Sequence, residues 1–103
     1  MRSGIGYDVH RLATGRRLVL GGIAIEHHQG LVGHSDGDVL LHAIMDALLG
    51  AANLGDLGAH FPSGDEAYRG ASSVGLLERV GTKVAEAGYR ILSLDATVIA
   101  AAV

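Results

Sequence analysis

Three side chains near the start and middle of the chain could bind one metal ion. Asp8 and His10 are two residues apart in a segment of alternating character. On a strand they would share a face and lie about 6.5 to 7 Å apart along the backbone, close enough to share an ion. His42 stands among leucines, where an imidazole needs a hydrogen-bonded partner or a metal. Three nitrogen and oxygen ligands with a fourth position open predict a catalytic zinc.

Two carboxylates flank His42 at helical spacing. Asp38 and Asp46 lie four residues before and after it, on one stripe of a helix, and we expect them to orient its imidazole from behind. In the alternative interpretation, Asp8 and His10 are ordinary exposed residues and His42 is a hydrogen-bonded core histidine. For D-x-H alone that alternative is the better explanation. The coincidence of D-x-H with H-S-D-G-D and the aspartate, histidine, aspartate stripe favours the metal.

A phosphate site is indicated at His34 and Ser35, where a loop enters this helix. The first turn of a helix offers unpaired N–H groups and the positive end of its dipole to an anion. In the alternative, Ser35 is only the helix cap, and Asp36 and Asp38 only complement the dipole. Spacing alone does not choose between the two.

Two polar segments after the helix could cover a bound sugar phosphate. They are Asp56, Leu57 and Gly58, a polar turn, and Phe61, Pro62, Ser63, Gly64 and Asp65, which begin a mobile loop. Plain loop chemistry is the alternative. His27, His28 and His60 have no ligand-like spacing and are predicted to be surface residues.

The elements that must position these residues follow from periodicity. Alternation at 4–10 predicts a strand that places Asp8 and His10 on one face. Apolar runs at 18–20 and 23–25, separated by two glycines, predict a hairpin, and 26–33 a polar loop. Residues 37–52, apolar on nearly every side, predict a buried helix with Ser35 as its cap.

The second half of the chain is predicted to hold a loop, a helix and a strand. Residues 53–70 contain the only proline and no sustained periodicity, which is typical of a long mobile loop. Ser72 or Ser73 is predicted to cap a second helix, which stops at Gly88. Its apolar stripe is Leu77, Val80, Val84 and Ala87. Residues 89–103 return to β character, and their apolar ending predicts missing chain or a partner that covers the edge.

Composition narrows the class of protein. The 103 residues fit a single domain, 1–103, and the balance of 49% apolar to 18% charged residues is that of a folded domain. A net charge of -3 gives no general attraction to nucleic acid or to an anionic membrane. The absence of cysteine excludes disulfides and thiolate ligands. Without a signal peptide pattern or a long apolar run, a cytoplasmic protein is expected.

Six strings occur in order along the chain: G-Y-D-V-H at 6–10, L-V-L-G-G at 18–22, H-S-D-G-D-V-L-L-H-A at 34–43, D-A-L-L-G at 46–50, L-G-D-L-G at 54–58 and D-A-T-V-I at 95–99. In order and spacing they resemble the bacterial and plastid 2-C-methyl-D-erythritol 2,4-cyclodiphosphate synthase family. The resemblance implies a homotrimer of α/β (α+β) subunits, each a β-sheet with helices packed on one side, with active sites between neighbours.

The resemblance also implies roles for the candidate residues. Asp8, His10 and His42 would be the zinc ligands, and His34 and Ser35 would contact substrate phosphate, with His34 stabilising the transition state. Residues 56–58 would contact the methylerythritol part, and 61–65 would form the flexible substrate loop. The family commonly has aspartate then threonine where this chain has Ser63 and Gly64.

The implied reaction is intramolecular. The 2-phosphate of a cytidine-diphosphate methylerythritol substrate attacks the β-phosphate and expels cytidine monophosphate, which requires positioning and charge neutralisation. The family continues for another third of its length, with the cytidine-binding segment, a catalytic threonine and a glutamate that holds a second ion, Mg²⁺ or Mn²⁺. We therefore expect these 103 residues to be its amino-terminal two-thirds. The alternatives are a zinc phosphoesterase and an inactive zinc-binding fragment.

Overall fold

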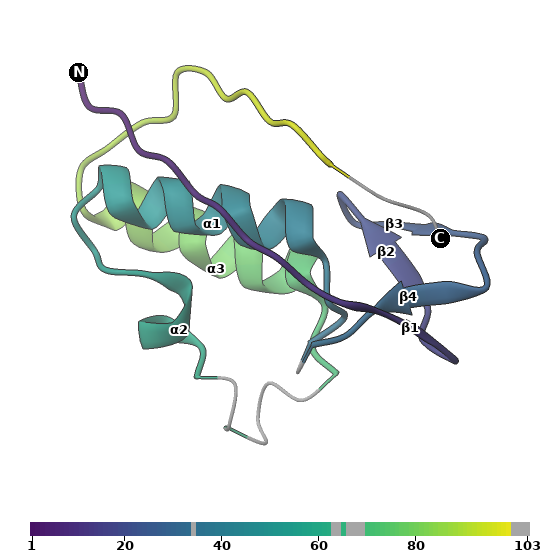
Figure 1. Cartoon of the computed structure of the whole chain (residues 1–103). Coiled ribbons are helices and arrows are strands. Elements are labelled where there is room, and N and C mark those ends of the chain that lie inside the picture. Colours follow the sequence, from purple (N-terminus) through teal and green to yellow (C-terminus); the bar gives the residue numbers. More distant parts are fainter. Residues whose placement is uncertain (34, 63–64, 66–69, 100–103) are drawn as a thin grey trace.

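The computed structural model describes residues 1–33, 35–62, 65 and 70–99 and belongs to the α+β class, as predicted (Figure 1). Its elements in chain order are β1 Leu12–Thr14, β2 Leu18–Leu20, β3 Ile23–Ile25, β4 Gln29–Leu31, α1 Val39–Ala51, α2 Leu57–His60 and α3 Ser73–Glu86. The prediction of one sheet with helices on one side is only partly met, because the described strands form two separate antiparallel pairs. In the described part of the chain, no helix has the length and apolar character needed to cross a membrane.

The β2–β3 hairpin confirms the prediction made from its two glycines. Leu18 pairs with Ile25 and Leu20 with Ile23, so two residues form the turn. Gly21 has φ 62° and Gly22 φ 79°. A tight turn that needs positive φ at both central positions suits the twist of antiparallel strands, and glycine adopts it without steric cost.

The β1–β4 pair was not predicted. Leu12 pairs with Leu31 and Thr14 with Gln29, so part of the expected loop at 26–33 is a strand. Three-residue strands are too short for a recognisable alternation, and β4 has a glycine at its centre. Gly30 is buried, and a Cβ there would overlap the carbonyl oxygens of Arg16 and Arg17. Close approach of two backbones therefore explains this glycine.

Helices α1 and α3 lie side by side and form the core (Figure 1). The buried cluster consists of Leu41, Met45, Leu49, Ala52, Phe61, Leu76, Val80 and Val84. In α3 the buried stripe passes through Leu76, whereas the predicted Leu77 is half-buried and the predicted Ala87 is exposed beyond the helix end. The helix was thus predicted correctly, with an error in one flank of its apolar face.

The cap of α1 differs from prediction, whereas α3 begins at Ser73, directly after Ser72, as predicted. Asp38, not Ser35, caps α1, because its carboxylate accepts the N–H of Leu41 at 3.1 Å. Ser72 precedes α3 but makes no side-chain capping bond. The Asp36 carboxylate instead accepts the N–H of Ser73 at 2.9 Å. A residue from another segment thus provides the hydrogen-bond acceptor that the first turn of this helix lacks.

The loop predicted at 53–70 contains a short helix. Asp56 caps α2 by accepting the N–H of Ala59 at 2.9 Å. A single helical turn has too few residues to show a period, which explains the error. The remainder of this prediction falls partly on 63–64 and 66–69, outside the described residues.

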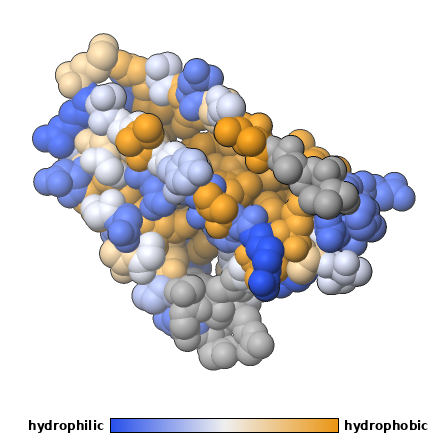
Figure 2. Space-filling model, viewed as in Figure 1, coloured by the Kyte–Doolittle hydropathy of each residue, from blue (hydrophilic) through white to orange (hydrophobic). Residues whose placement is uncertain are grey.

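The strands predicted at 4–10 and from residue 89 onward are not formed in the described parts of those segments. A strand needs a neighbour for its backbone N–H and C=O groups, and neither segment pairs with another strand within the part of the chain that the structure describes. Figure 1 shows the amino-terminal segment crossing the helices and residues 89–99 running back along the edge of α1 toward the strands. Figure 2 shows apolar surface gathered on this same face. The exposed large apolar residues of the two segments include Ile5, Tyr7, Val9, Ile91, Leu92, Leu94, Val98 and Ile99.

Candidate metal centre

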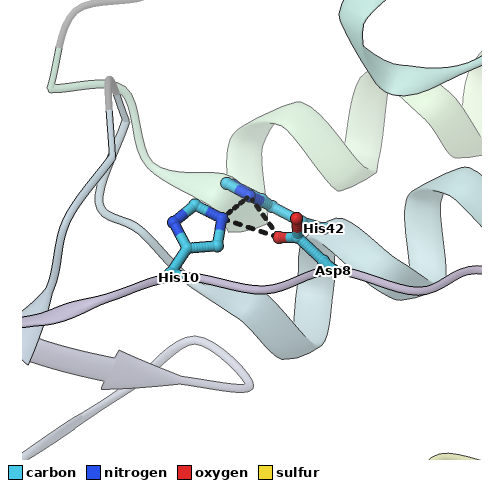
Figure 3. A group of neighbouring side chains, drawn as sticks. All are labelled: Asp8, His10 and His42. Carbon is cyan, nitrogen blue, oxygen red and sulfur yellow. Dashed lines mark hydrogen bonds and ion pairs between the residues drawn. The ribbon is translucent and has the colours of Figure 1, made fainter.

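Asp8, His10 and His42 come together as predicted (Figure 3). His10 Nε2 lies 2.7 Å from Asp8 Oδ2, and His42 Nδ1 lies 3.2 Å from the same oxygen. His42 Nδ1 and His10 Nε2 are 3.3 Å apart. Two ligands come from the extended amino-terminal segment and one from α1, so the fold assembles the site from residues more than thirty positions apart.

Glycines place the amino-terminal segment directly on α1. A Cβ on Gly6 would overlap the carbonyl oxygen of Ala43, and one on Gly4 would overlap that of Ala47. The same alternation that turns these glycines toward the helix brings Asp8 and His10 toward His42. The predicted shared face is therefore correct, although the segment is not paired as a strand.

The hydrogen bonds of the two imidazoles indicate which nitrogen of each is available to a metal. His10 Nδ1 bonds to the carbonyl oxygen of Val32, which only accepts, so Nδ1 carries the proton and Nε2 faces the cluster. His42 Nε2 lies 3.1 Å from Ser35 Oγ and 3.0 Å from Ser73 Oγ, while Nδ1 faces the cluster. Metal-binding histidines usually use their second ring nitrogen in this way.

Asp8 has the protonation state that a metal ligand requires. Burial raises the pKa of its carboxyl, but the hydrogen bond with His42 and the charges of His10 and His42 outweigh burial, so the pKa lies below its usual value. The group is therefore ionised at neutral pH. Asp36 behaves similarly: burial raises its pKa, and hydrogen bonds from the hydroxyl and N–H of Ser73 and the N–H of Asp38 lower it further than burial raises it.

The donor set fits a divalent metal ion. In a tetrahedral site with bonds of about 2.0 to 2.1 Å, ligand atoms lie about 3.3 Å from one another. The separations of 3.2 and 3.3 Å match this value, and only the His10 to Asp8 distance of 2.7 Å is shorter. One carboxylate and two imidazoles suit zinc, and other first-row metals also bind such ligands.

Asp38 and Asp46 do not orient His42, contrary to prediction. The Asp38 carboxylate accepts the N–H groups of Gly21, Gly22 and Leu41, which ties the hairpin to the start of α1. Asp46 accepts the N–H of Leu57 at 2.7 Å. A spacing of four places side chains on one stripe, but their rotamers and tertiary neighbours decide their partners.

Two serine hydroxyls contact His42 at Nε2, the ring nitrogen that faces away from the cluster. Ser73 is completely buried and donates its hydroxyl proton to Asp36 Oδ1. The sequence predicted Ser73 only as a helix start and Asp36 only as a complement to the dipole. Since Ser73 lies 31 residues from His42, no local pattern connects them.

On the predicted phosphate side, Ser35 is beside His42, and His34 lies outside the described residues. Sequence reasoning missed Arg16. Its guanidinium donates to the carbonyl oxygens of Leu31 and Gly33 at 3.1 Å and of Ser35 at 3.4 Å. Arg16 thus holds the loop that carries Ser35.

The residues predicted to cover a sugar phosphate have structural roles as well. Asp56, Leu57 and Gly58 begin α2 rather than a polar turn. Phe61 is buried in the core, whereas Pro62 and Asp65 are exposed and joined by a backbone hydrogen bond of 3.1 Å. Ser63 and Gly64 lie outside the described residues.

The remaining histidines were predicted to be surface residues. That prediction is correct for His27 and His28, which are exposed and whose ring centroids are 4.4 Å apart. His60 is half-buried, and its Nε2 bonds to the carbonyl oxygen of Leu54 at 2.7 Å. It therefore has a structural partner that the sequence did not reveal.

Comparison with known proteins shows which family the chain is similar to. The model of the YgbB family matches residues 1–103. The 2-C-methyl-D-erythritol 2,4-cyclodiphosphate synthases of Lachnospira eligens and Agathobacter rectalis are 62% and 64% identical to the chain over 100 residues, or 97% of it. The chain spans 55% and 56% of their lengths.

A solved structure of such a synthase in a CDP-bound form is similar too. It has a TM-score of 0.77 and 45% identity, and the match covers 84% of this chain and 58% of that one.

Proposed function

The chain belongs to the YgbB family, and from that membership we propose that it carries the metal-binding part of a cyclodiphosphate synthase active site. The proposed reaction converts 4-diphosphocytidyl-2-C-methyl-D-erythritol 2-phosphate to 2-C-methyl-D-erythritol 2,4-cyclodiphosphate and cytidine monophosphate, a step toward isoprenoid precursors. The observation that carries the proposal is the convergence of Asp8, His10 and His42 in a chain 62% identical to a named synthase. The bacterial sources of the relatives favour the cytoplasm as its place.

Zinc is the metal that we propose for the cluster, held by Asp8 Oδ2, His10 Nε2 and His42 Nδ1. When bound, the ion supplies positive charge that polarises and orients the substrate diphosphate. With an ion bound, Asp8 would stay ionised and each imidazole would turn an unprotonated nitrogen toward the ion, His10 Nε2 and His42 Nδ1. These residues thereby present a charge of -1, which leaves an excess positive charge for the diphosphate.

The substrate phosphates are assigned to the loop beside the cluster. We propose that Ser35 and His34 contact phosphate and that His34 stabilises the transition state. The position of Ser35 Oγ, 3.1 Å from His42 Nε2, supports its assignment, and Arg16 holds this loop in place. Holding both ends of one molecule near each other supplies the proximity that an intramolecular attack requires.

The sugar part and the assembly complete the proposal. We assign Asp56, Leu57 and Gly58 and the segment 61–65 to the methylerythritol portion, and a second ion, Mg²⁺ or Mn²⁺, to the site of the whole enzyme. A homotrimer is proposed from the exposed apolar residues of the segments 5–9 and 91–99, which a lone subunit leaves in water. Light scattering at several concentrations tests this assembly, and a monomer at every concentration would contradict it.

The test of function follows zinc and product together. Elemental analysis of dialysed protein is expected to give about one zinc per chain, and His42→Ala to lose it. The cytidine substrate is then supplied to the 103 residues and to a form extended to the length of the relatives. Cytidine monophosphate with a cyclic product supports the proposal. Release of inorganic phosphate would instead indicate a zinc phosphoesterase, and full zinc retention by His42→Ala would refute the ligand assignment.

A further inference from the structure

A chain of two hydrogen bonds supports the ring of His42 on the side away from the cluster. His42 Nε2 lies 3.0 Å from Ser73 Oγ, and the Ser73 hydroxyl bonds in turn to Asp36 Oδ1. His42 and Ser73 are both buried, at 8% and 0% exposure. Three segments, the loop before α1, α1 itself and the start of α3, thus meet behind one imidazole.

The direction of these bonds follows from the proton count of each group. An ionised carboxylate has no proton and only accepts hydrogen bonds, and a serine hydroxyl has one proton to donate. Because Ser73 donates that proton to Asp36, it can only accept from His42. His42 Nε2 must therefore carry a ring proton, and in the neutral ring Nδ1 then has the lone pair. Asp8 Oδ2 lies 3.2 Å from Nδ1 and also only accepts, so it favours the opposite tautomer, and Asp36 and Ser73 act against it.

We propose that Asp36 and Ser73 are positioning residues that hold His42 in the tautomer whose unprotonated Nδ1 faces Asp8 and His10. This inference deepens the proposed function, on which its relevance to a metal rests. The opposite tautomer would direct an N–H bond at the place where a metal ion needs a lone pair. By selecting the tautomer before the ion arrives, the pair raises the affinity of the cluster.

Ser35 provides an internal control. Its hydroxyl lies 3.1 Å from the same nitrogen, almost as close as that of Ser73. No described group receives the Ser35 hydroxyl proton in the way that Asp36 receives that of Ser73. Ser35 can therefore donate to His42 or accept from it, and it does not select a tautomer.

A purely structural role must be separated from this one. Asp36 Oδ2 accepts the N–H of Ser73 and so stabilises the start of α3. Substitution of Asp36 would disturb this helix as well as the hydrogen-bond chain from His42 through Ser73 to Asp36. Ser73→Ala keeps the backbone N–H bond, and Asp36 Oδ1 retains the N–H of Asp38 at 3.1 Å. Ser73→Ala is therefore the variant that removes the hydrogen-bond chain and leaves the helix start intact.

The first measurement is the tautomer of His42 in metal-free, ¹⁵N-labelled protein, by long-range ¹H–¹⁵N correlation NMR at mildly alkaline pH. The parent protein and Ser35→Ala are expected to show one tautomer, protonated at Nε2. Ser73→Ala is expected to show a mixture, and Asp36→Asn, whose amide can donate to Ser73, a shift toward the other tautomer. An unchanged Ser73→Ala pattern, or an equal change in Ser35→Ala, would overturn the proposal.

The second measurement is zinc affinity by competition with a chelator. Ser73→Ala is expected to bind zinc about 10 to 100-fold more weakly, the usual loss when a group behind a metal ligand is removed. Its circular dichroism and thermal unfolding should match the parent within the range of an ordinary substitution. Parental affinity in Ser73→Ala would count against the inference. A parent that shows the expected tautomer but binds no zinc would refute the proposed metal function and leave the tautomer assignment standing.

Discussion

The helix α1 and the extended segment 4–10 both supply metal ligands, but they are held in place by different means. Helix α1 makes its own backbone hydrogen bonds and buries Met45 and Leu49 completely. The extended segment has no strand partner among the described residues, and its apolar Ile5 is 91% exposed. One ligand thus stands on a helix of the core, and two stand on a segment with exposed apolar residues.

This difference separates the stability of the domain from the integrity of its site. The position of His42 follows from the packing of α1 against α3. The positions of Asp8 and His10 depend on the glycine contact with α1 and on the bond from His10 to Val32. Substitutions in the two regions should therefore affect different observables.

The largest effect on folding is expected for Leu49→Ala in the helix pair. Removing most of a fully buried leucine leaves a cavity, which typically lowers the free energy of unfolding by about 2 to 5 kcal/mol. Urea unfolding followed by circular dichroism measures it. Leu49→Met, which nearly conserves volume, is the control and should cost less than about 1.5 kcal/mol. Similar losses from both variants would show that α1 is not packed as described.

A smaller effect, confined to the site, is expected for Gly6→Ala. The added methyl would overlap the Ala43 carbonyl and push the segment away from α1, so zinc affinity should fall about 10 to 100-fold, or about 1.4 to 2.8 kcal/mol. Chelator competition measures this loss. Gly81→Ala in α3, where a methyl meets nothing within 4 Å, is the matched control and should leave zinc affinity unchanged. If Gly6→Ala unfolded the helices as well, the stability of the domain and the integrity of the site would not be separate, contrary to the proposal.

The smallest effect is expected for Ile5→Ser. Its side chain is exposed, so little apolar area is returned to water and the free energy of unfolding of the monomer should change by less than about 0.5 kcal/mol. Urea unfolding at a concentration where light scattering shows monomer provides the measurement. A loss of 2 kcal/mol or more would mean that the segment is buried in the monomer after all, and the contrast with α1 would disappear.

The success of the structural predictions follows the same division. The hairpin at Gly21 and Gly22 and the two long helices were predictable, because each depends on residues within a few positions of one another. The short strands β1 and β4 and the caps at Asp38 and Asp36 were not. These depend on which distant segment lies alongside, and the sequence has no local signal for that.

The sequence by itself determined the chemistry of the candidate site: D-x-H placed a carboxylate and an imidazole on one face, and a lone histidine among leucines indicated the third ligand. Only the tertiary structure decided what stands behind those ligands. Asp38 and Asp46 were the neighbours by spacing, yet Val32, Ser73 and Asp36 hold the imidazoles. The physical reason is that helical and strand periods relate residues a few positions apart, whereas partners 22 to 37 residues away are chosen by how the elements pack.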